Sequence, residues 1–427
     1  MIKFIKNLLK RNKTRFKDKV SFRELVSNKD IQKLFKLINS YSDESELRFV
    51  GGCIRKIISE EKVDDIDLST NLEPKNIIEI LSKNQINFYD TGIEHGTITA
   101  EINKKSFEIT SLRRDVNTDG RHAQVEYTKN WHDDASRRDF TINAIYSDFD
   151  GNLFDPFNGK KDLSDGSIRF IGDSAKRIKE DYLRILRYLR FFLSYSKKQH
   201  NKDTIKTIKQ NLKGLKKISK ERHLQELKKI ITLENFNKLS SDKIAKELYL
   251  LIFPELKYIN RLSNLDNIKY NILKNKNFEF ILSLLLIDNS EDCDYFFYKY
   301  KLSNRERNKI NILKTIFAEE QSKNYFTKEN LSKKIIKYGK ENLLDILDFK
   351  ILISKKNINY LLELKKYFID FEIPVMPIKA IDLIEKFNLK EGKLLGLILK
   401  EIEDIWLNNN FKISNDQVED IVKSKHI

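Results

Sequence analysis

The chain has little cysteine, little histidine and no long apolar run, and each shortage excludes a class of protein. Its two cysteines, Cys53 and Cys293, are too few for a disulfide framework and suit a reducing compartment, so we expect a cytoplasmic protein. Of the 6 histidines, His122 and His132 lack the spacing of metal ligands, so no zinc site is expected. The longest apolar stretch, residues 280–287, is far below the roughly 20 residues that cross a bilayer, so we expect no membrane span.

The charge of the chain is strongly positive. Lysine and arginine total 80 against 63 aspartates and glutamates, which gives a formal net charge of +17 among 427 residues. Such a balance favours a polyanionic partner, either a nucleic acid or an anionic membrane surface. Residues 1–20 are themselves basic, with apolar residues at helical spacing. We interpret them as a basic helix or tail and leave an RNA contact and a membrane-surface role open.

The sequence changes character near residue 170. Before this point lie most of the glycines and several short strand-like runs, among them residues 47–50 and a hairpin over 97–102 and 106–112. Residues 142–146 and 168–171 are further strand candidates. After residue 174, apolar residues recur at helical spacing almost throughout. The predicted fold class is therefore α+β, with a small mixed sheet followed by an all-helical part.

Asp65 and Asp67 point most directly to a chemistry. On a strand, residues i and i+2 face the same side, and two carboxylates so placed can share a pair of divalent metals for phosphoryl transfer. Upstream, the turn at Gly51 and Gly52 can direct backbone N–H groups at a phosphate, and Arg55 adds a positive charge. Together these motifs suggest a nucleotidyl-transferring enzyme. Each motif alone is also compatible with a solvated loop or a plain turn.

Glu108 is a candidate third carboxylate. It lies in the second strand of the predicted hairpin, with Thr110 on the same face. If that strand neighbours the acidic one, Glu108 can add a ligand to the metals or activate the attacking hydroxyl. A surface or cross-strand ion pair is the equal alternative.

Two polar stretches follow the hairpin. Residues 113–123 are charged and lack an apolar pattern, so we predict a mobile loop that acts as a lid. In the second stretch, the fork of Arg138 can bind a triphosphate, while Asp139 and Asn143 suit ribose hydroxyls. An ion-paired helix start is the alternative for this second stretch.

Asp181, Arg184, Arg187 and Arg190 recur every three residues. On one helix this spacing would form a slanting row along a face. An aspartate accepts from a base amino group and an arginine donates to a ring nitrogen or carbonyl, so Asp181 and Arg184 can read a base edge. The alternative is an i,i+3 salt bridge between them, followed by a solvated basic stripe.

The order of these motifs resembles class II tRNA nucleotidyltransferases, the branch of the polymerase β superfamily that includes CCA-adding enzymes and bacterial poly(A) polymerases. The shared motifs are Gly-Gly-x-x-Arg at 51–55, Asp-x-Asp at 65–67, His-Gly-Thr at 95–97, Arg-Arg-Asp-Phe-Thr-Ile-Asn-Ala at 137–144 and Glu-Asp-x-x-Arg at 180–184. The similarity is strong over residues 47–230 and thins beyond. The family usually has aspartate after the arginine of the first motif, where this chain has Lys56, so the support of Arg55 stays open.

The resemblance implies an architecture and a role for each candidate. It implies a basic extension over residues 1–45, a catalytic head over 46–172, a nucleotide-selecting neck over 173–235 and a tRNA-binding body and tail over 236–427. The implied roles are Mg²⁺ binding by Asp65 and Asp67, triphosphate contact by Gly51, Gly52 and Arg55, sugar and phosphate contact by Arg138, Asp139 and Asn143, and base selection by Asp181 and Arg184 supported by Arg187 and Arg190. Residues 114–123 would be the loop that switches between nucleotides.

The activity implied is addition of C, C and A to the 3′ end of tRNA from CTP and ATP, without a nucleic-acid template and with two metals. A poly(A) polymerase or a partial (A-adding or CC-adding) enzyme is the close alternative. A noncatalytic basic RNA-binding protein is the distant one. The sequence leaves the oligomeric state open.

Overall fold

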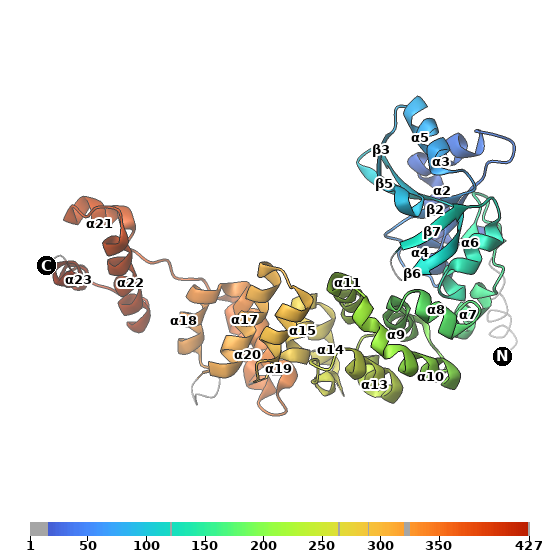
Figure 1. Ribbon diagram of the computed structural model, residues 1–427. Helices are drawn as coiled ribbons and strands as arrows, with labels where there is room; N and C mark the ends of the chain where they lie inside the picture. The colour runs from blue at the N-terminus through green and yellow to red at the C-terminus, as the bar shows by residue number, and fades with distance from the viewer. Residues whose placement is uncertain (1–15, 120–121, 264, 289, 320–324, 426–427) are drawn as a thin grey trace, which may run out of the picture. The chain divides into compact units, whose positions relative to one another are not determined.

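The computed structural model describes residues 16–119, 122–263, 265–288, 290–319 and 325–425, which divide into two compact units (Figure 1). The first unit is Met1–Ile252 and the second is Phe253–Ile427. No helix in the described part is long and apolar enough to cross a membrane.

Seven strands of the first unit, within the described residues, form one mixed sheet in the order β3-β4-β5-β2-β1-β8-β9. The strands are β1 (Leu47–Val50), β2 (Asp67–Thr70), β3 (Asn87–Gly92), β4 (Thr97–Ile102), β5 (Lys105–Ser111), β8 (Tyr146–Ser147) and β9 (Leu153–Phe154). The pair β2 and β5 is parallel, and the other neighbouring pairs are antiparallel. The predicted α+β class with a mixed sheet is confirmed.

The first helices of this unit precede the sheet, the next connect its strands, and those from residue 159 onward follow the last strand. They are α2 (Val20–Ser27), α3 (Lys29–Asn39), α4 (Gly52–Ile58), α5 (Pro74–Lys83), α6 (Trp131–Arg137), α7 (Gly159–Asp165), α8 (Ser174–Glu180), α9 (Leu183–Tyr195), α10 (Lys202–Asn211), α11 (Lys220–Ile231), α12 (Lys238–Ser241) and α13 (Lys243–Ile252). The 3₁₀ turns are η1 (Phe16–Asp18), η2 (Ile93–His95), η3 (Thr141–Asn143) and η4 (Leu212–Lys217).

One apolar core joins the N-terminal helices to the sheet. Phe22 of α2 and Leu34 of α3 are buried in the same cluster as Phe49 of β1 and Ile54 of α4. Helix α3 begins at an N-cap, where the Asn28 side chain accepts from the Asp30 N–H at 2.9 Å. Residues 16–39 thus share the core of the sheet although they fall in the predicted extension 1–45. The four-part division of the chain stays a prediction.

The predicted hairpin over 97–112 is confirmed as β4 and β5. Its turn residues, Asn103 and Lys104, both have positive φ values (52° and 63°), as a tight two-residue turn requires. Two other strand predictions are largely wrong. Of residues 142–146, Ile142 and Asn143 lie in η3 and only Tyr146 lies in a strand, β8. Of residues 168–171, only Phe170 makes an isolated bridge, to Phe140. These apolar residues are buried by packing among loops and helices, a burial that the apolar pattern does not distinguish from a strand.

The predicted lid is also different from expectation. Residues Arg113–Asp119 form β6 and His122–Tyr127 form β7, a two-stranded antiparallel sheet of their own. Arg114 and Glu126 lie opposite each other and pair at 3.1 Å. A ladder of backbone hydrogen bonds and a cross-strand ion pair stabilise these strands, so the predicted loop is largely a hairpin. Its role as a mobile lid stays a prediction. Residues 120–121 lie outside the described residues.

The second unit is helical. Its elements are η5 (Ile259–Leu262), α14 (Asn267–Lys274), α15 (Phe278–Leu286), α16 (Asp292–Tyr300), α17 (Asn304–Glu319), α18 (Lys328–Tyr338), α19 (Lys340–Ile353), α20 (Ile358–Asp370), α21 (Ala380–Phe387), α22 (Lys393–Asn408) and α23 (Asn415–Lys425). Helices α21, α22 and α23 share a core of their own, with Leu383, Ile398 and Ile421 buried in it. The helical pattern predicted after residue 174 is confirmed.

Candidate active site

The two acidic residues lie at the start of β2. Asp67 opens the strand, and Asp65 lies in the segment without regular structure before it, so the prediction that both belong to the strand holds for Asp67 only. Burial raises the pKa of Asp67 above its ordinary value, the Arg138 charge acts against that rise, and the Asp65 charge adds to it. The segment therefore holds two carboxylates whose negative charges repel each other at a partly buried position.

Glu108 lies on the strand next to the acidic one. In the parallel pair of β2 and β5, Glu108 is the register partner of Asp67. Burial raises the pKa of the Glu108 carboxyl, and the charges of Asp67 and Asp65 raise it further. The strand of Glu108 thus neighbours the strand of Asp67, which is the condition under which the sequence analysis gave Glu108 a role at the metals.

The donor set fits a hard divalent cation. Carboxylate oxygens are the ligands that Mg²⁺ takes in proteins, and a cation would relieve the repulsion that raises the pKa of Asp67 and Glu108. Within the described residues, no group of three or more histidine, cysteine, aspartate or glutamate side chains is gathered closely enough to form a metal site by itself. A ligand role for Glu108 stays a prediction.

The glycine turn lies against these carboxylates. Gly51 has φ 66°, a region that L side chains rarely adopt. A Cβ at Gly52 would lie 3.4 Å from Oδ2 of Asp67, so a side chain there would occupy the space beside the carboxylate. The two glycines therefore serve different needs, since the first allows the turn and the second leaves room next to Asp67.

The buried carboxylate of Asp134, which the sequence analysis did not predict as a site residue, holds Arg138 in place. The Asp134 side chain is 1% exposed and accepts from Arg137 at 2.7 Å, from Arg138 at 3.2 Å and from the Tyr146 hydroxyl at 2.6 Å. Burial alone would raise the pKa of Asp134, but the two guanidinium groups hold it well below its usual range. The sequence carries a signal for this, because Asp134 stands three and four residues before Arg137, the last residue of α6, and Arg138, its C-cap, at the spacing of helical ion pairs.

Replacing Asp134 by alanine is expected to destabilise the first unit by about 3–5 kcal/mol. The change leaves two guanidinium groups and a buried hydroxyl without their shared acceptor, and removing one partner of a buried ion pair has this cost. Urea denaturation measures the effect. The neighbouring Asp133→Ala change removes a partly buried carboxylate that accepts one hydrogen bond, from Thr128, and should cost less than about 1 kcal/mol. Equal losses in the two variants would contradict the role of Asp134.

A chain of polar contacts connects the glycine turn to helix α9. Arg55 donates to the Asn143 side-chain oxygen, and Asn143 donates to Asp139 at 2.8 Å. Asp139 in turn pairs with Arg187 at 2.6 Å. Burial opposes ionisation of Asp139, but Arg187 and the hydrogen bond from Asn143 hold its pKa low. Arg55 also packs on the Phe191 ring at 4.8 Å, so it is well supported although Lys56 replaces the usual aspartate.

Asp181 does not lie on the helix of the three arginines. Helix α8 ends at Glu180, and Asp181 has the extended dihedrals φ −153° and ψ 107° before α9 begins. The prediction that Asp181 shares one helical row with the three arginines is therefore wrong. One carboxylate oxygen of Asp181 instead accepts from Arg222 of α11 at 2.8 Å, and the other accepts from the Leu183 N–H at 3.0 Å.

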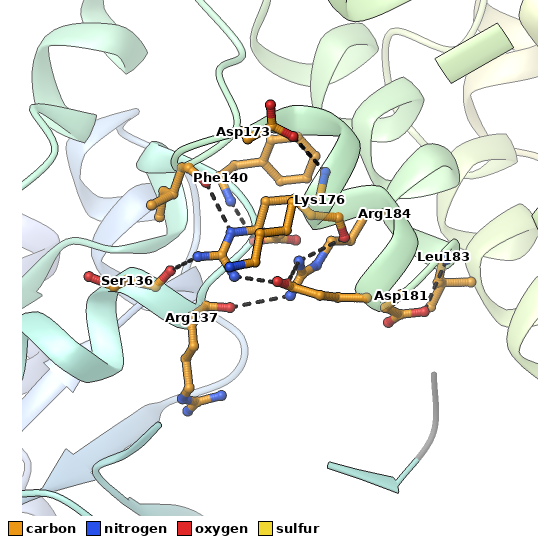
Figure 2. Close-up of polar contacts among 12 residues, drawn as sticks. Ser136, Arg137, Phe140, Asp173, Lys176, Asp181, Leu183 and Arg184 are labelled. Atoms are coloured by element: carbon orange, nitrogen blue, oxygen red, sulfur yellow. Dashed lines mark hydrogen bonds and ion pairs between the residues drawn. The ribbon is translucent and has the colours of Figure 1, made fainter. Parts of the chain in front are cut away.

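Arg184 is held by a separate cluster of contacts (Figure 2). Its guanidinium donates to Glu180 at 2.7 Å and to the Arg137 carbonyl at 3.2 Å. Glu180 also accepts from Arg177 at 2.8 Å, and Arg177 donates to the Ser136 carbonyl. These contacts tie the end of α6 to the junction of α8 and α9. They fix Arg184 independently of Asp181.

Arg187 and Arg190 follow Arg184 along α9, as the spacing predicted. Arg190 donates to the buried Glu226 of α11 at 2.8 Å and lies over the Phe191 ring at 4.3 Å. Both side chains are therefore paired rather than part of a solvated stripe.

These residues line one cleft of about 930 Å³ within the first unit. The predicted site residues on its wall are Gly51, Gly52, Arg55, Asp65, Asp67, Arg138, Asp139, Asn143, Asp181, Arg184, Arg187 and Arg190. The wall also carries polar residues that were not predicted as site residues: Lys56, Ser69, His95, Thr97, Thr110, Arg113, Arg137, Glu180, Arg222 and Lys229. Glu108 is adjacent to the acidic strand but does not line the cleft.

Comparison with known proteins finds matches over most of the chain. A family described as "Poly A polymerase head domain" matches residues 47–169, and one described as "Probable RNA and SrmB- binding site of polymerase A" matches residues 201–259. The CCA tRNA nucleotidyltransferase 1, mitochondrial, of Homo sapiens is 33% identical over 392 residues, which cover 89% of this chain and 87% of the human protein. The CCA-adding enzyme of Staphylococcus haemolyticus is 30% identical, over 87% of this chain and 92% of that enzyme.

Solved structures have the same fold. The Bacillus stearothermophilus CCA-adding enzyme in complex with CTP aligns with a TM-score of 0.69 at 21% identity, over 93% of this chain and 98% of that one. The Thermotoga maritima CCA-adding enzyme complexed with tRNA aligns with a TM-score of 0.63 at 21% identity, over 94% of this chain and 98% of that one.

Proposed function

Since this chain belongs to the family of CCA-adding tRNA nucleotidyltransferases, we propose that it adds C, C and A to the 3′ end of tRNA, taking CTP and ATP as substrates without a nucleic-acid template. The observation that carries the proposal is the single cleft that brings the carboxylates at the start of β2 together with the glycine turn and with Asp181 and Arg184. In the reaction the 3′-hydroxyl of the RNA attacks the α-phosphorus of the nucleotide, a new phosphodiester bond forms and pyrophosphate leaves.

Asp65 and Asp67 would hold divalent cations, Mg²⁺ in our proposal, which on binding lower the pKa of the attacking hydroxyl and neutralise the leaving pyrophosphate. Glu108 adds negative charge beside Asp67 from the neighbouring strand and favours cation binding at the pair. The absence of a side chain at Gly52 keeps the space beside Asp67 open for the phosphates.

The triphosphate would lie against Arg55 and Arg138. Both guanidinium groups are already oriented, Arg55 by Asn143 and Phe191 and Arg138 by Asp134 and Tyr146. Charges fixed in advance stabilise a developing negative charge without reorganising when the reaction takes place.

Asp139 and Asn143 would hold other residues of the site in position in addition to contacting the nucleotide. Asp139 is 7% exposed and Asn143 is 5% exposed, and each joins the contact chain between Arg55 and Arg187. The role proposed for them at the sugar and phosphates is thus partly a positioning role.

Base selection would depend on the junction of α8 and α9. Cytosine and adenine both present an exocyclic amino group beside an acceptor ring nitrogen, which suits an aspartate acceptor and an arginine donor. Arg184 is held in place by Glu180 and the Arg137 carbonyl (Figure 2), so it can act as a fixed donor. Asp181 is bound to Arg222, which we place beside Arg187 and Arg190 as a support of the selecting residues. We assign the switch between nucleotides to the hairpin of β6 and β7.

The rest of the chain would hold the tRNA. The net charge of +17 suits binding to the phosphates of an A-form RNA, which a protein recognises largely by shape and backbone contacts. We propose a cytoplasmic location; the name of the human relative places that protein in mitochondria.

Nucleotide incorporation into tRNA transcripts tests this function. Transcripts that end at the discriminator base, after C and after CC are each supplied with Mg²⁺ and with CTP, ATP or both. We expect two C additions from CTP alone on the first transcript, and one A addition from ATP alone on the third. A-tailing of all three RNAs would indicate a poly(A) polymerase, while addition of only C or only A would indicate a partial enzyme. No incorporation at all would leave a noncatalytic RNA-binding protein.

A further inference from the structure

We propose that His95, Thr97, Thr110 and Arg113 form the subsite that holds the terminal ribose and phosphate of the RNA whose 3′-hydroxyl attacks. The inference rests on the proposed function and adds residues that it does not assign. All four line the same cleft as Asp65 and Asp67.

The order of strands places this group and the proposed nucleotide-binding residues on opposite sides of the acidic strand, β2. Strand β2 lies between β1 and β5 in the sheet. The glycine turn and Arg55 follow β1, whereas Thr110 lies on β5 and Thr97 on β4, the next strand outward. In nucleotidyl transfer the attacking and leaving oxygens lie roughly in line on opposite sides of the α-phosphorus. With the triphosphate on the β1 side, the RNA end approaches from the β5 side.

The two threonines stand on the same face of the sheet as the carboxylates. Thr110 is the register partner of Ser69, just as Glu108 is the partner of Asp67 two residues earlier, and alternate residues of a strand share a face. Thr97 is in turn the partner of Thr110, and their hydroxyl oxygens are 2.9 Å apart. The pair therefore presents two neighbouring hydroxyl groups on the cleft wall, one strand away from the site of reaction.

The turn that carries His95 is fixed by the base of the β6–β7 hairpin. Arg113 of β6 donates to the His95 carbonyl, and the Ser111 N–H donates to the Gly96 carbonyl at 2.8 Å. Gly96 has φ 73°, and a Cβ there would lie 3.0 Å from the Tyr127 ring of β7. Only glycine fits this turn without displacing that ring. The guanidinium of Arg113 thus holds the backbone of the turn that carries His95, and both residues line the cleft.

The chemistry of the group suits a ribose and a phosphate. Hydroxyl, imidazole and guanidinium groups bind sugar hydroxyls and phosphate oxygens, contacts that position a nucleic acid and carry no base sequence. The RNA end changes at each addition, from the discriminator nucleotide to C and then to a second C. A subsite that ignores the base accepts all three ends, while selection is left to the residues that face the incoming nucleotide.

Steady-state kinetics of a Thr97→Val, Thr110→Val double variant test the subsite. Valine keeps the shape of threonine and removes only the hydroxyl. We expect the KM for tRNA ending in CC to rise about tenfold, as the loss of one or two hydrogen bonds predicts, with the KM for ATP changed less than about twofold. Thr99→Val is the matched control, because Thr99 is the next residue on the same face of β4 and does not line the cleft. It should leave both constants unchanged.

A second readout separates a binding role from a merely structural one. Wild-type enzyme should extend a tRNA whose terminal ribose lacks its 2′-hydroxyl about tenfold less efficiently than the all-ribose tRNA, and the double variant should lose that preference. An unchanged KM for tRNA in the double variant, or equal rises in the KM for tRNA and for ATP, would overturn the subsite. In that event wild-type CCA addition would still support the proposed function, whereas its absence from the wild type would reject the function itself.

Discussion

Replacing Asp67 by asparagine is expected to slow nucleotide incorporation by about a thousandfold or more. The change keeps the size of the side chain and removes the charge that, with Asp65, would hold the cations. Metal ions contribute several kcal/mol of transition-state stabilisation in phosphoryl transfer, and each 1.4 kcal/mol is about tenfold in rate. Single-turnover incorporation of ATP into tRNA ending in CC, at saturating nucleotide, measures the effect.

Asp64→Asn is the matched control for this loss. Asp64 stands three residues before Asp67 and carries the same carboxylate, but it pairs with Lys56 at 2.9 Å and does not line the cleft. We expect near wild-type incorporation from it, and a thermal midpoint no lower than that of the wild type in both variants, because neutralising Asp67 relieves repulsion from Asp65. Activity retained by Asp67→Asn, or an equal loss in Asp64→Asn, would contradict the assignment of Asp67.

Replacing Asp181 by alanine is expected to relax the choice of nucleotide. The change removes the acceptor for the base amino group, while Arg184 keeps its contacts with Glu180 and the Arg137 carbonyl. One base contact of this kind discriminates by about 1–3 kcal/mol, so the ratio of kcat/KM for CTP to that for UTP should fall about ten- to a hundredfold. Competition between the two nucleotides on tRNA ending at the discriminator base measures the ratio.

Glu247→Ala is the control for Asp181→Ala, because it also removes a carboxylate from an ion pair of the first unit, with Lys209 at 2.6 Å, and does not line the cleft. Its nucleotide ratio should match that of the wild type. If Asp181→Ala keeps the ratio and loses only rate, Asp181 supports the site without selecting the base.

The motifs of the sequence predicted which residues meet, and the reason is local. Gly51, Gly52 and Arg55 belong to one strand, turn and helix, and the hairpin of β4 and β5 carries its own turn signal. Once the hairpin lies beside β2, alternation along the strands lets Glu108 share a face with Asp67, while the register that makes them partners is set by the packing of the sheet. These inferences depend on neighbours in the chain, where periodicity is informative.

The contacts that fix the site could not be predicted in the same way. Asp181 and Arg222 are 41 residues apart, and Arg55 and Asn143 are 88 apart. Such partners are set by tertiary packing and not by spacing. The end of α8 at Glu180 had the same effect, since a break of two residues before α9 moved Asp181 off the predicted helical row. Strand β6 was missed because it lacks the apolar alternation by which strands are recognised. Strand β7 does alternate, with apolar residues at Ala123, Val125 and Tyr127, but most of it lies beyond the charged stretch that was predicted as a loop.

A crystal structure of the chain bound to CTP and Mg²⁺ tests the central claim most directly, because that claim is that one cleft both selects the nucleotide and transfers it. The account predicts the α-phosphate beside Asp65 and Asp67, the triphosphate against the turn at Gly51–Gly52, and the cytosine amino group within hydrogen-bond distance of Asp181. A nucleotide bound outside the cleft, or one whose base contacts neither Asp181 nor Arg184, would contradict it.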